Sequence, residues 1–184
     1  MTAPRWRAAF VAASSAWALL LFAAPFAASR SHASLLASAL IVGVYSIGSL
    51  VCHQLPERSY HIWTAQMPVC ARCAGIYVGA AGAAVFAATF RKAEALRHSA
   101  ALRQRPTVVA QGFSPARIAR TVVARGFSPV RVALVLAAAP TLLTLVYEWS
   151  TGDRPSHPIR AAAGVPIGVV VSWLVVAAAH YRVH

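Results

Sequence analysis

Five stretches without a charged side chain limit what this chain can fold into. They cover residues 8–28, 33–51, 73–90, 132–147 and 161–179. A helix that crosses a bilayer needs about 20 predominantly apolar residues, and most of these stretches come close to that length. Charged residues make up only 11% of the chain, whereas a typical soluble domain has about 25%. The sequence therefore predicts an all-α, polytopic transmembrane helical bundle of four to five helices.

Two of the stretches are open to another interpretation. The first follows Arg5 and Arg7 and ends in small residues, as a signal peptide does. Its apolar run is longer than a usual signal core, so we favour a retained helix. The fourth has 16 residues, which is short for a span. Pro129 suits its first turn, and Pro140 predicts a kink.

These stretches divide the chain into four parts. Residues 1–34 form an N-terminal helix, either transmembrane or signal-like. Residues 35–90 form two transmembrane helices that flank a Cys/His motif. Residues 91–130 form a basic linker that we expect to be mobile, and 131–184 form two further transmembrane helices.

Positive charge is concentrated in the linker. The chain has 17 Lys+Arg against 4 Asp+Glu, a net charge of +13. We expect no nucleic-acid partner, because arginines between apolar segments usually fix topology and contact anionic lipid headgroups. The linker also contains a direct repeat, in which 107–119 recurs as 121–133. Two copies are too few for a solenoid, so we interpret the repeat as a duplicated insertion.

The orientation follows from the distribution of this charge. If all five stretches span, the linker side of the membrane holds 11 Lys+Arg and the other side holds 6. The positive-inside rule then places the linker in the cytoplasm and the Cys/His face outside it. A cleaved first stretch would contradict this orientation, because the mature chain would then begin outside.

All three cysteines lie within residues 52–73. His53 follows Cys52, and Cys70 and Cys73 are three residues apart. Three thiols and one imidazole are a candidate ligand set for one zinc or another soft transition metal, with His61 as an alternative to His53. Adjacent residues point in different directions on a helix, so Cys52 and His53 need not both be ligands.

Two other interpretations of the cysteines stay open. Pro68 suits the first turn of a helix, and both a helix N-terminus and Arg72 favour thiolates. Cys70 and Cys73 could therefore form a redox dithiol, with Cys52 as the resolving thiol. Alternatively, the three cysteines only pack between apolar helices.

Several polar residues share a membrane face with the cysteines, because consecutive spans alternate in direction. The residues that could support the site are Gln54, Glu57, Arg58, His61, Arg72, Tyr77, Glu148 and Arg160. Glu57 and Arg58 could form a surface pair. Arg72 either binds an anion or pairs with Glu148, and an acid at membrane depth is a functional candidate by default.

Two glycine patterns predict helix packing. Residues 75–79 and 164–168 are both GxxxG, a pattern that lets helix backbones approach closely. We expect the third and fifth stretches to contact each other through them. The same faces are candidates for a helix-mediated homo-oligomer.

The residues around the cysteines resemble a known family, the small prokaryotic membrane proteins of domain of unknown function 2085. The resemblance is carried by residues 52–54, 56–60, 68–73, 75–77 and Gly79. A weaker similarity involves Glu148, Ser156, Arg160, Gly164 and Gly168. The resemblance implies a prokaryotic plasma-membrane location and a role for Cys52, His53, Cys70, Arg72 and Cys73, but it implies no reaction.

The leading hypothesis is a Cys/His metal-binding site at the membrane surface. One alternative is a membrane thiol–disulfide oxidoreductase, or a metal-dependent enzyme that uses the same cysteines with Glu148 or Glu57 as acid or base. Another is a non-catalytic membrane scaffold. The sequence has no phosphate-binding glycine loop or dinucleotide fingerprint, so we expect no nucleotide cofactor.

Overall fold

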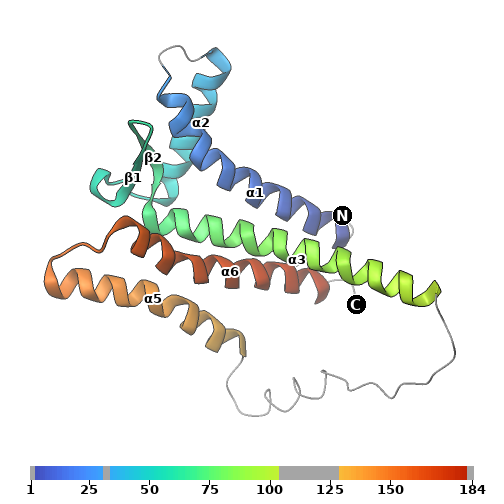
Figure 1. The fold of residues 1–184 in the computed structure, drawn as a ribbon. Helices are drawn as coiled ribbons and strands as arrows, with labels where there is room; N and C mark the ends of the chain where they lie inside the picture. Colours follow the sequence, from blue (N-terminus) through green and yellow to red (C-terminus); the bar gives the residue numbers. More distant parts are fainter. Residues whose placement is uncertain (1–2, 31–33, 104–128, 182–184) are drawn as a thin grey trace.

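The computed structural model describes residues 3–30, 34–103 and 129–181 (Figure 1). Its elements in chain order are α1 (Ala3–Ala28), α2 (Leu35–Val51), the 3-10 helix η1 (Pro56–Arg58), β1 (Ser59–Ile62), β2 (Ala65–Cys70), α3 (Ala71–Arg103), α5 (Pro129–Thr151) and α6 (His157–Tyr181). The prediction of a mainly helical fold is confirmed. The first copy of the repeat, and the lipid contacts expected for most of the linker, lie outside the described residues.

Four helices are long and apolar enough to cross a membrane. They are α1, α3, α5 and α6, with apolar segments at Arg5–Ala28, Ala71–Phe90, Val130–Thr151 and His157–Ala178. Each segment has between 20 and 24 residues, which matches the thickness of the hydrocarbon core. The prediction of a polytopic bundle is therefore confirmed.

The helix α5 is longer than the uncharged stretch 132–147 that predicted it. The uncharged run ends at Tyr147, but α5 continues to Thr151. Glu148 does not interrupt the helix, because its carboxylate is paired with arginines from other elements. Gly152 follows with a φ of +74°, the left-handed conformation that commonly terminates a helix.

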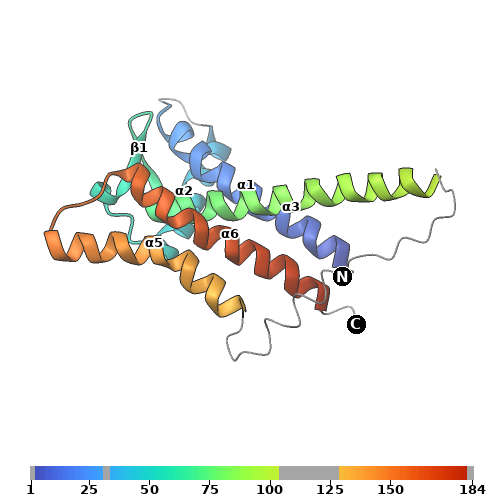
Figure 2. The ribbon, with the colours of Figure 1, turned by 60° about the horizontal axis from the view of Figure 1, so that its bottom comes forward.

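The second predicted stretch is shorter than a usual span. α2 has 17 residues and lies across the end of the bundle, transverse to α3 and α6, in both views (Figures 1 and 2). The chain therefore does not cross the bundle again between α1 and α3. Consequently Arg5 and Arg7 lie at the end opposite the cysteines, whereas we expected them on the cysteine face.

The segment between Cys52 and α3 forms a β-hairpin, which we had not predicted. β1 and β2 are antiparallel, and Ser59 pairs with Cys70. The turn residues Trp63 and Thr64 have φ values of +51° and +72°, a region that asparagine and glycine usually occupy in hairpin turns. Because neither residue is a turn former, the sequence carried no hairpin signal there.

The linker is partly helical. We expected a mobile segment from residue 91, but α3 continues to Arg103. Residues 91–103 contain no glycine or proline and are rich in alanine, leucine, arginine and other strong helix formers. Pro106 is the first residue beyond the apolar segment that disfavours a helix.

α3 and α6 run side by side from the cysteine end of the bundle (Figure 1). A Cβ atom on Gly75 or Gly79 would overlap the α6 backbone at Ala161 or Val165, and one on Gly164 would overlap the carbonyl of Arg72. The predicted contact between the third and fifth stretches is therefore confirmed. These glycine faces pack within the chain, and the helix-mediated homo-oligomer stays a prediction.

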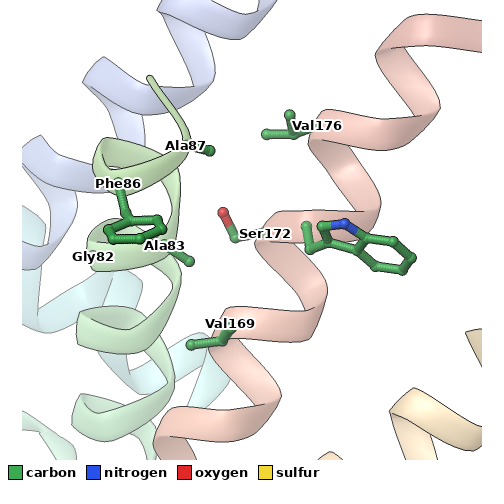
Figure 3. Close-up of a pocket in the computed structure, with 8 residues that line it drawn as sticks. Gly82, Ala83, Phe86, Ala87, Val169, Ser172 and Val176 are labelled. Atoms are coloured by element: carbon green, nitrogen blue, oxygen red, sulfur yellow. The ribbon is translucent and has the colours of Figure 1, made fainter. Parts of the chain in front are cut away.

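A groove of about 470 Å³ lies between α3 and α6, beyond the glycine contacts (Figure 3). Its walls include Gly82 and Phe86 of α3 and Val169 and Val176 of α6. Ser172 is the polar residue among those that line it. The groove is a surface for apolar groups and is separate from the cysteine end.

Candidate metal centre

Three thiols from three elements meet at one end of the bundle. Cys52 caps the C-terminal end of α2, Cys70 ends β2 and Cys73 lies in the first turn of α3. Their sulfur atoms all lie within 4.8 Å of one another, and the backbone N–H of Cys70 donates a hydrogen bond to Cys52 Sγ at 3.2 Å. All three are half-buried free thiols. The fold therefore gathers every cysteine of the chain into one cluster.

Gln54 connects the segment after Cys52 to the hairpin. Its side-chain amide donates to the carbonyls of Tyr45 at 2.9 Å and Pro68 at 2.7 Å. The side chain of Gln66 donates to the Gln54 carbonyl at 2.5 Å. These bonds hold the chain on either side of Cys52 against β2, just before Cys70.

The predicted histidine ligands are not part of this cluster. His53 and His61 are both exposed, and the group of mutually close ligand atoms contains only the three cysteines among the residues described. Tyr77 lies near the cluster but packs edge-on against Trp17, with ring centroids 6.0 Å apart. A fourth protein ligand therefore stays a prediction.

The environment of Cys70 favours its thiolate. Hydrogen bonds from the Cys73 side chain, from the backbone N–H groups of Cys73 and Arg72 and from the Cys52 side chain lower the pKa of the Cys70 thiol to about 5, against the opposing effect of burial. The N–H groups belong to the start of α3, where helices stabilise negative charge. At neutral pH the metal-free cluster therefore holds one thiolate.

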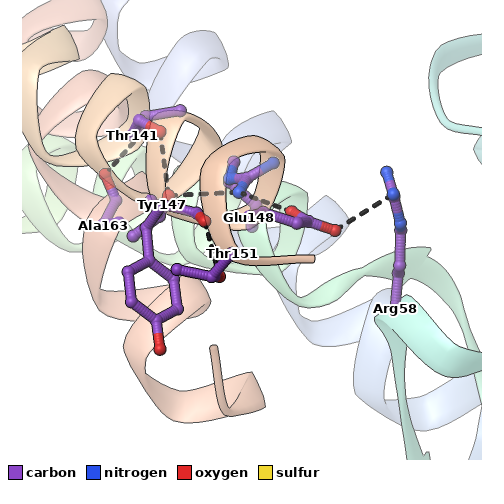
Figure 4. A network of polar contacts seen from close by, with 8 residues as sticks. Arg58, Thr141, Tyr147, Glu148, Thr151 and Ala163 are labelled. Atoms are coloured by element: carbon purple, nitrogen blue, oxygen red, sulfur yellow. Dashed lines mark hydrogen bonds and ion pairs between the residues drawn. The ribbon is translucent and has the colours of Figure 1, made fainter. Parts of the chain in front are cut away.

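A buried ion-pair network borders the cysteines. Arg58 Nη2 lies 3.0 Å from Glu148 Oε1, and Arg72 Nη2 lies 3.8 Å from Glu148 Oε2 (Figure 4). Arg72 also donates to Thr144 Oγ1 at 3.1 Å. The Glu148 side chain is only 6% exposed. The network joins η1, α3 and α5 around one carboxylate.

Only part of this network was predictable from the sequence. The predicted pair of Arg72 with Glu148 is present. Glu57 does not pair with Arg58 as expected, and instead pairs with Arg154 at 3.6 Å on the surface. Arg58 and Glu148 are far apart in the sequence, so no spacing pattern indicates that they pair.

Arg160 is the most deeply buried charged residue beside this network. It lies in the first turns of α6 and is 1% exposed. It interacts electrostatically with Glu148, Arg72, Arg58 and Cys70. Within the described part of the chain its side chain forms no hydrogen bond or ion pair, and its Nε is buried without a partner.

Comparisons with known proteins agree with the resemblance seen in the sequence. The chain is 43% identical over 61 residues to an uncharacterised protein of Methanocaldococcus jannaschii; the alignment covers 33% of this chain and 39% of that protein's length. No solved structure matches the chain. Residues 52–110 match the family model described as "Predicted membrane protein (DUF2085)". The segment that carries the cysteines is therefore similar to the domain of unknown function 2085 family of predicted membrane proteins.

Proposed function

We propose that Cys52, Cys70 and Cys73 bind one soft transition metal, with zinc as the first candidate. The observation that supports this is the convergence of three sulfur atoms within 4.8 Å. Thiolates are the ligands that zinc and other soft metals prefer, whereas magnesium and calcium prefer oxygen. The donor set therefore fits a soft metal.

The spacing of the thiols is compatible with this metal. Zinc–sulfur bonds of about 2.3 Å with tetrahedral angles place the sulfur atoms about 3.8 Å apart. The present separations are no larger than 4.8 Å, so small side-chain rotations are enough to close the site. The amide of Gln54 would hold the Cys52 segment in place during that closure.

The fourth coordination position would be open or filled by His53. Sites with three protein ligands and one exchangeable position are typical of catalytic zinc, whereas structural zinc usually has four protein ligands. His53 is exposed and would have to turn toward the cluster. An open position is consistent with a metal-dependent enzyme, and a closed one with a structural site.

The cysteine end would face away from the cytoplasm. By their positions along the described elements, Arg5, Arg7, Arg91, Lys92, Arg97, Arg103 and Arg131 lie toward the opposite end, and Arg30, Arg58, Arg72, Arg154 and Arg160 lie at the cysteine end. Three of the latter belong to the buried cluster around Glu148. The positive-inside rule therefore favours a cytoplasmic linker end.

Labelling of a single introduced cysteine tests this orientation. Asp153→Cys, in a chain whose three native cysteines are serine, places an exposed thiol between α5 and α6. A membrane-impermeant maleimide should label it in intact cells. Labelling that requires lysis would reverse the proposed orientation.

Metal analysis of purified protein tests the metal site. Wild-type protein, purified in detergent without chelator, should contain close to one equivalent of a soft metal. The Cys70→Ser, Cys73→Ser double variant should contain none, whereas Glu57→Gln, at an exposed surface pair, should retain it. A wild type without metal, also after incubation with zinc, would exclude the proposal.

Thiol–disulfide exchange is a second candidate, and the low pKa of Cys70 favours it. The Cys70 thiolate would attack a partner's disulfide, and Cys73 or Cys52 would then release the reduced partner and leave an intramolecular disulfide. Equilibration with glutathione disulfide distinguishes the candidates. A redox site cycles between three and one free thiols without metal, whereas a metal site resists oxidation while the metal is bound.

A further inference from the structure

The arginines near Glu148 outnumber their counter-ions. Arg58 and Arg72 pair with the carboxylate of Glu148, and the buried Arg160 interacts with it electrostatically. This leaves two positive charges uncompensated by the acidic residues of the cluster. The other acids at the cysteine end, Glu57 and Asp153, do not neutralise them, because Glu57 pairs with Arg154 and Asp153 is exposed.

Arg160 is the least exposed of the three arginines. Its side chain is removed from water, being 1% exposed, and it has no ion pair or hydrogen bond among the residues that the structure describes. A buried charge without a partner is strongly unfavourable, so proteins usually neutralise it or pair it. Guanidinium groups do not lose their proton, so Arg160 requires an anion.

The cysteines supply at most part of that compensation. Even with one thiolate among the three cysteines, one positive charge would be left. A zinc ion with three thiolates also carries a single negative charge, which again leaves one positive charge. An excess of one positive charge therefore persists in both states of the cysteine site.

Donor groups for an anion are also in place. The Nε atoms of Arg58, Arg72 and Arg160 are each buried without a hydrogen-bond acceptor. His157 precedes Arg160 by one helical turn. Its ring packs against that of Tyr60, with centroids 5.3 Å apart, and its Nε2 is buried without a partner. These unpartnered donors come from η1, α3 and α6, and they gather at one end of the bundle.

We propose that Arg58, Arg72 and Arg160 bind a phosphate group beside the cysteine cluster. Guanidinium forks match phosphate oxygens in geometry. A phosphodiester carries one negative charge, which equals the local excess, and a phosphomonoester carries nearly two. The cluster lies where the apolar segments of α3 and α6 begin, so the phosphate belongs either to a lipid headgroup or to free phosphate. This site does not require the proposed metal.

Ligand-dependent thermal stabilisation tests the site. Full-length protein in detergent is compared in the metal-free and zinc-incubated forms, with inorganic phosphate, short-chain phosphatidate or short-chain phosphatidylglycerol at constant ionic strength. Binding to the folded state stabilises it by RT ln(1 + [L]/Kd), so the unfolding temperature keeps rising with the logarithm of the ligand concentration above Kd. Phosphate released by denaturation and phospholipid extracted from the protein are measured in parallel, to detect an anion that co-purifies.

Wild-type protein should be stabilised by at least one probe, or should release a bound phosphate or phospholipid. Arg160→Met should lose this response, Arg160→Lys should weaken it at least tenfold in affinity, and Arg154→Gln, at the surface pair with Glu57, should keep it. If Arg160→Met does not fold, Arg58→Gln, at a partly exposed side chain, should show the same loss. A response to phosphatidate or phosphatidylglycerol alone assigns the phosphate to a lipid, and a response to inorganic phosphate assigns it to free phosphate.

The proposal is overturned if wild-type protein neither responds to any probe nor releases phosphate or phospholipid. It is also overturned if Arg160→Met or Arg58→Gln responds as wild type does. Failure of the metal site is recognised separately, because it is read from metal content and not from the phosphate response.

Discussion

Arg58 and Glu148 form a 3.0 Å ion pair that joins the cysteine hairpin to α5. Arg58 ends η1, directly before β1, and Glu148 lies in the last turn of α5. Arg72 approaches the second carboxylate oxygen at 3.8 Å. One buried carboxylate thus holds two segments that neighbour cysteines in sequence, Arg58 before the hairpin and Arg72 between Cys70 and Cys73.

Removing this carboxylate should destabilise the protein strongly. Glu148→Gln leaves the buried guanidiniums without a negative partner, and breaking a buried pair in this way costs about 3–5 kcal/mol. Thermal unfolding in detergent measures the loss. Glu57→Gln is the control, because its surface pair with Arg154 contributes no more than about 1 kcal/mol. Equal unfolding temperatures for the two variants would show that the network does not support the fold.

The close packing of α3 on α6 can be tested with two glycines of the same helix. Gly75→Ala forces a methyl group against the backbone of Ala161, and overpacking of this kind costs about 1–3 kcal/mol. Gly82→Ala has nothing within 4 Å of the added carbon and should be neutral or stabilising by up to about 1 kcal/mol. Denaturation curves of both variants give the comparison. A Gly75→Ala variant as stable as Gly82→Ala would mean that the helices lie further apart.

Gln54 should control the metal affinity without being a ligand. Gln54→Ala removes the hydrogen bonds to Tyr45 and Pro68, so the segment after Cys52 is no longer held against β2. Residues that orient metal ligands typically change affinity by about 10–100-fold when mutated, and we expect a loss of that order. Competition with a chromophoric chelator measures it. Glu57→Gln, at an exposed surface pair, should leave the affinity unchanged; equal affinities for both variants would contradict the role of Gln54.

Thiol reactivity should depend on pH in a defined direction. The pKa of Cys70 in the folded protein is lowered to about 5 from an ordinary value of 9.0. The thiolate is therefore present in the folded, metal-free protein down to about pH 5, and the stability it contributes is lost as the pH falls through that value. Iodoacetamide should label one cysteine at pH 6, and Cys70→Ser should abolish this labelling. Labelling that begins only above about pH 8 would show that the hydrogen bonds to Cys70 are absent.

The apolar stretches predicted most of the helices because spanning segments have a strong compositional signal. The continuation of α5 beyond Glu148 was not predictable, since a charge normally ends an apolar run. The partners of Glu148, Arg58 and Arg72, come from distant segments. α2 was judged by its composition alone, which does not show that the helix lies across the bundle. The contact of α3 with α6 through Gly75 and Gly164 was predictable, because GxxxG spacing places the two glycines of each motif on one face of their helix.

The candidate site was predictable where its residues are close in sequence. Cys70 and Cys73 share the start of a helix, and Pro68 marks that start. The approach of Cys52 depends instead on the hairpin, whose turn at Trp63 and Thr64 has an unusual backbone conformation. Whether His53 joins the site depends on its side-chain orientation, which sequence spacing does not determine.

The central claim is that three thiolates share one metal ion, and X-ray absorption at the zinc edge tests it most directly. Zinc-incubated wild-type protein should show three sulfur neighbours at about 2.3 Å and one nitrogen or oxygen neighbour at about 2.0 Å. Cys52→Ser should reduce the sulfur count to two. A spectrum with only nitrogen and oxygen neighbours, or one that Cys52→Ser leaves unchanged, would contradict a site formed by Cys52, Cys70 and Cys73.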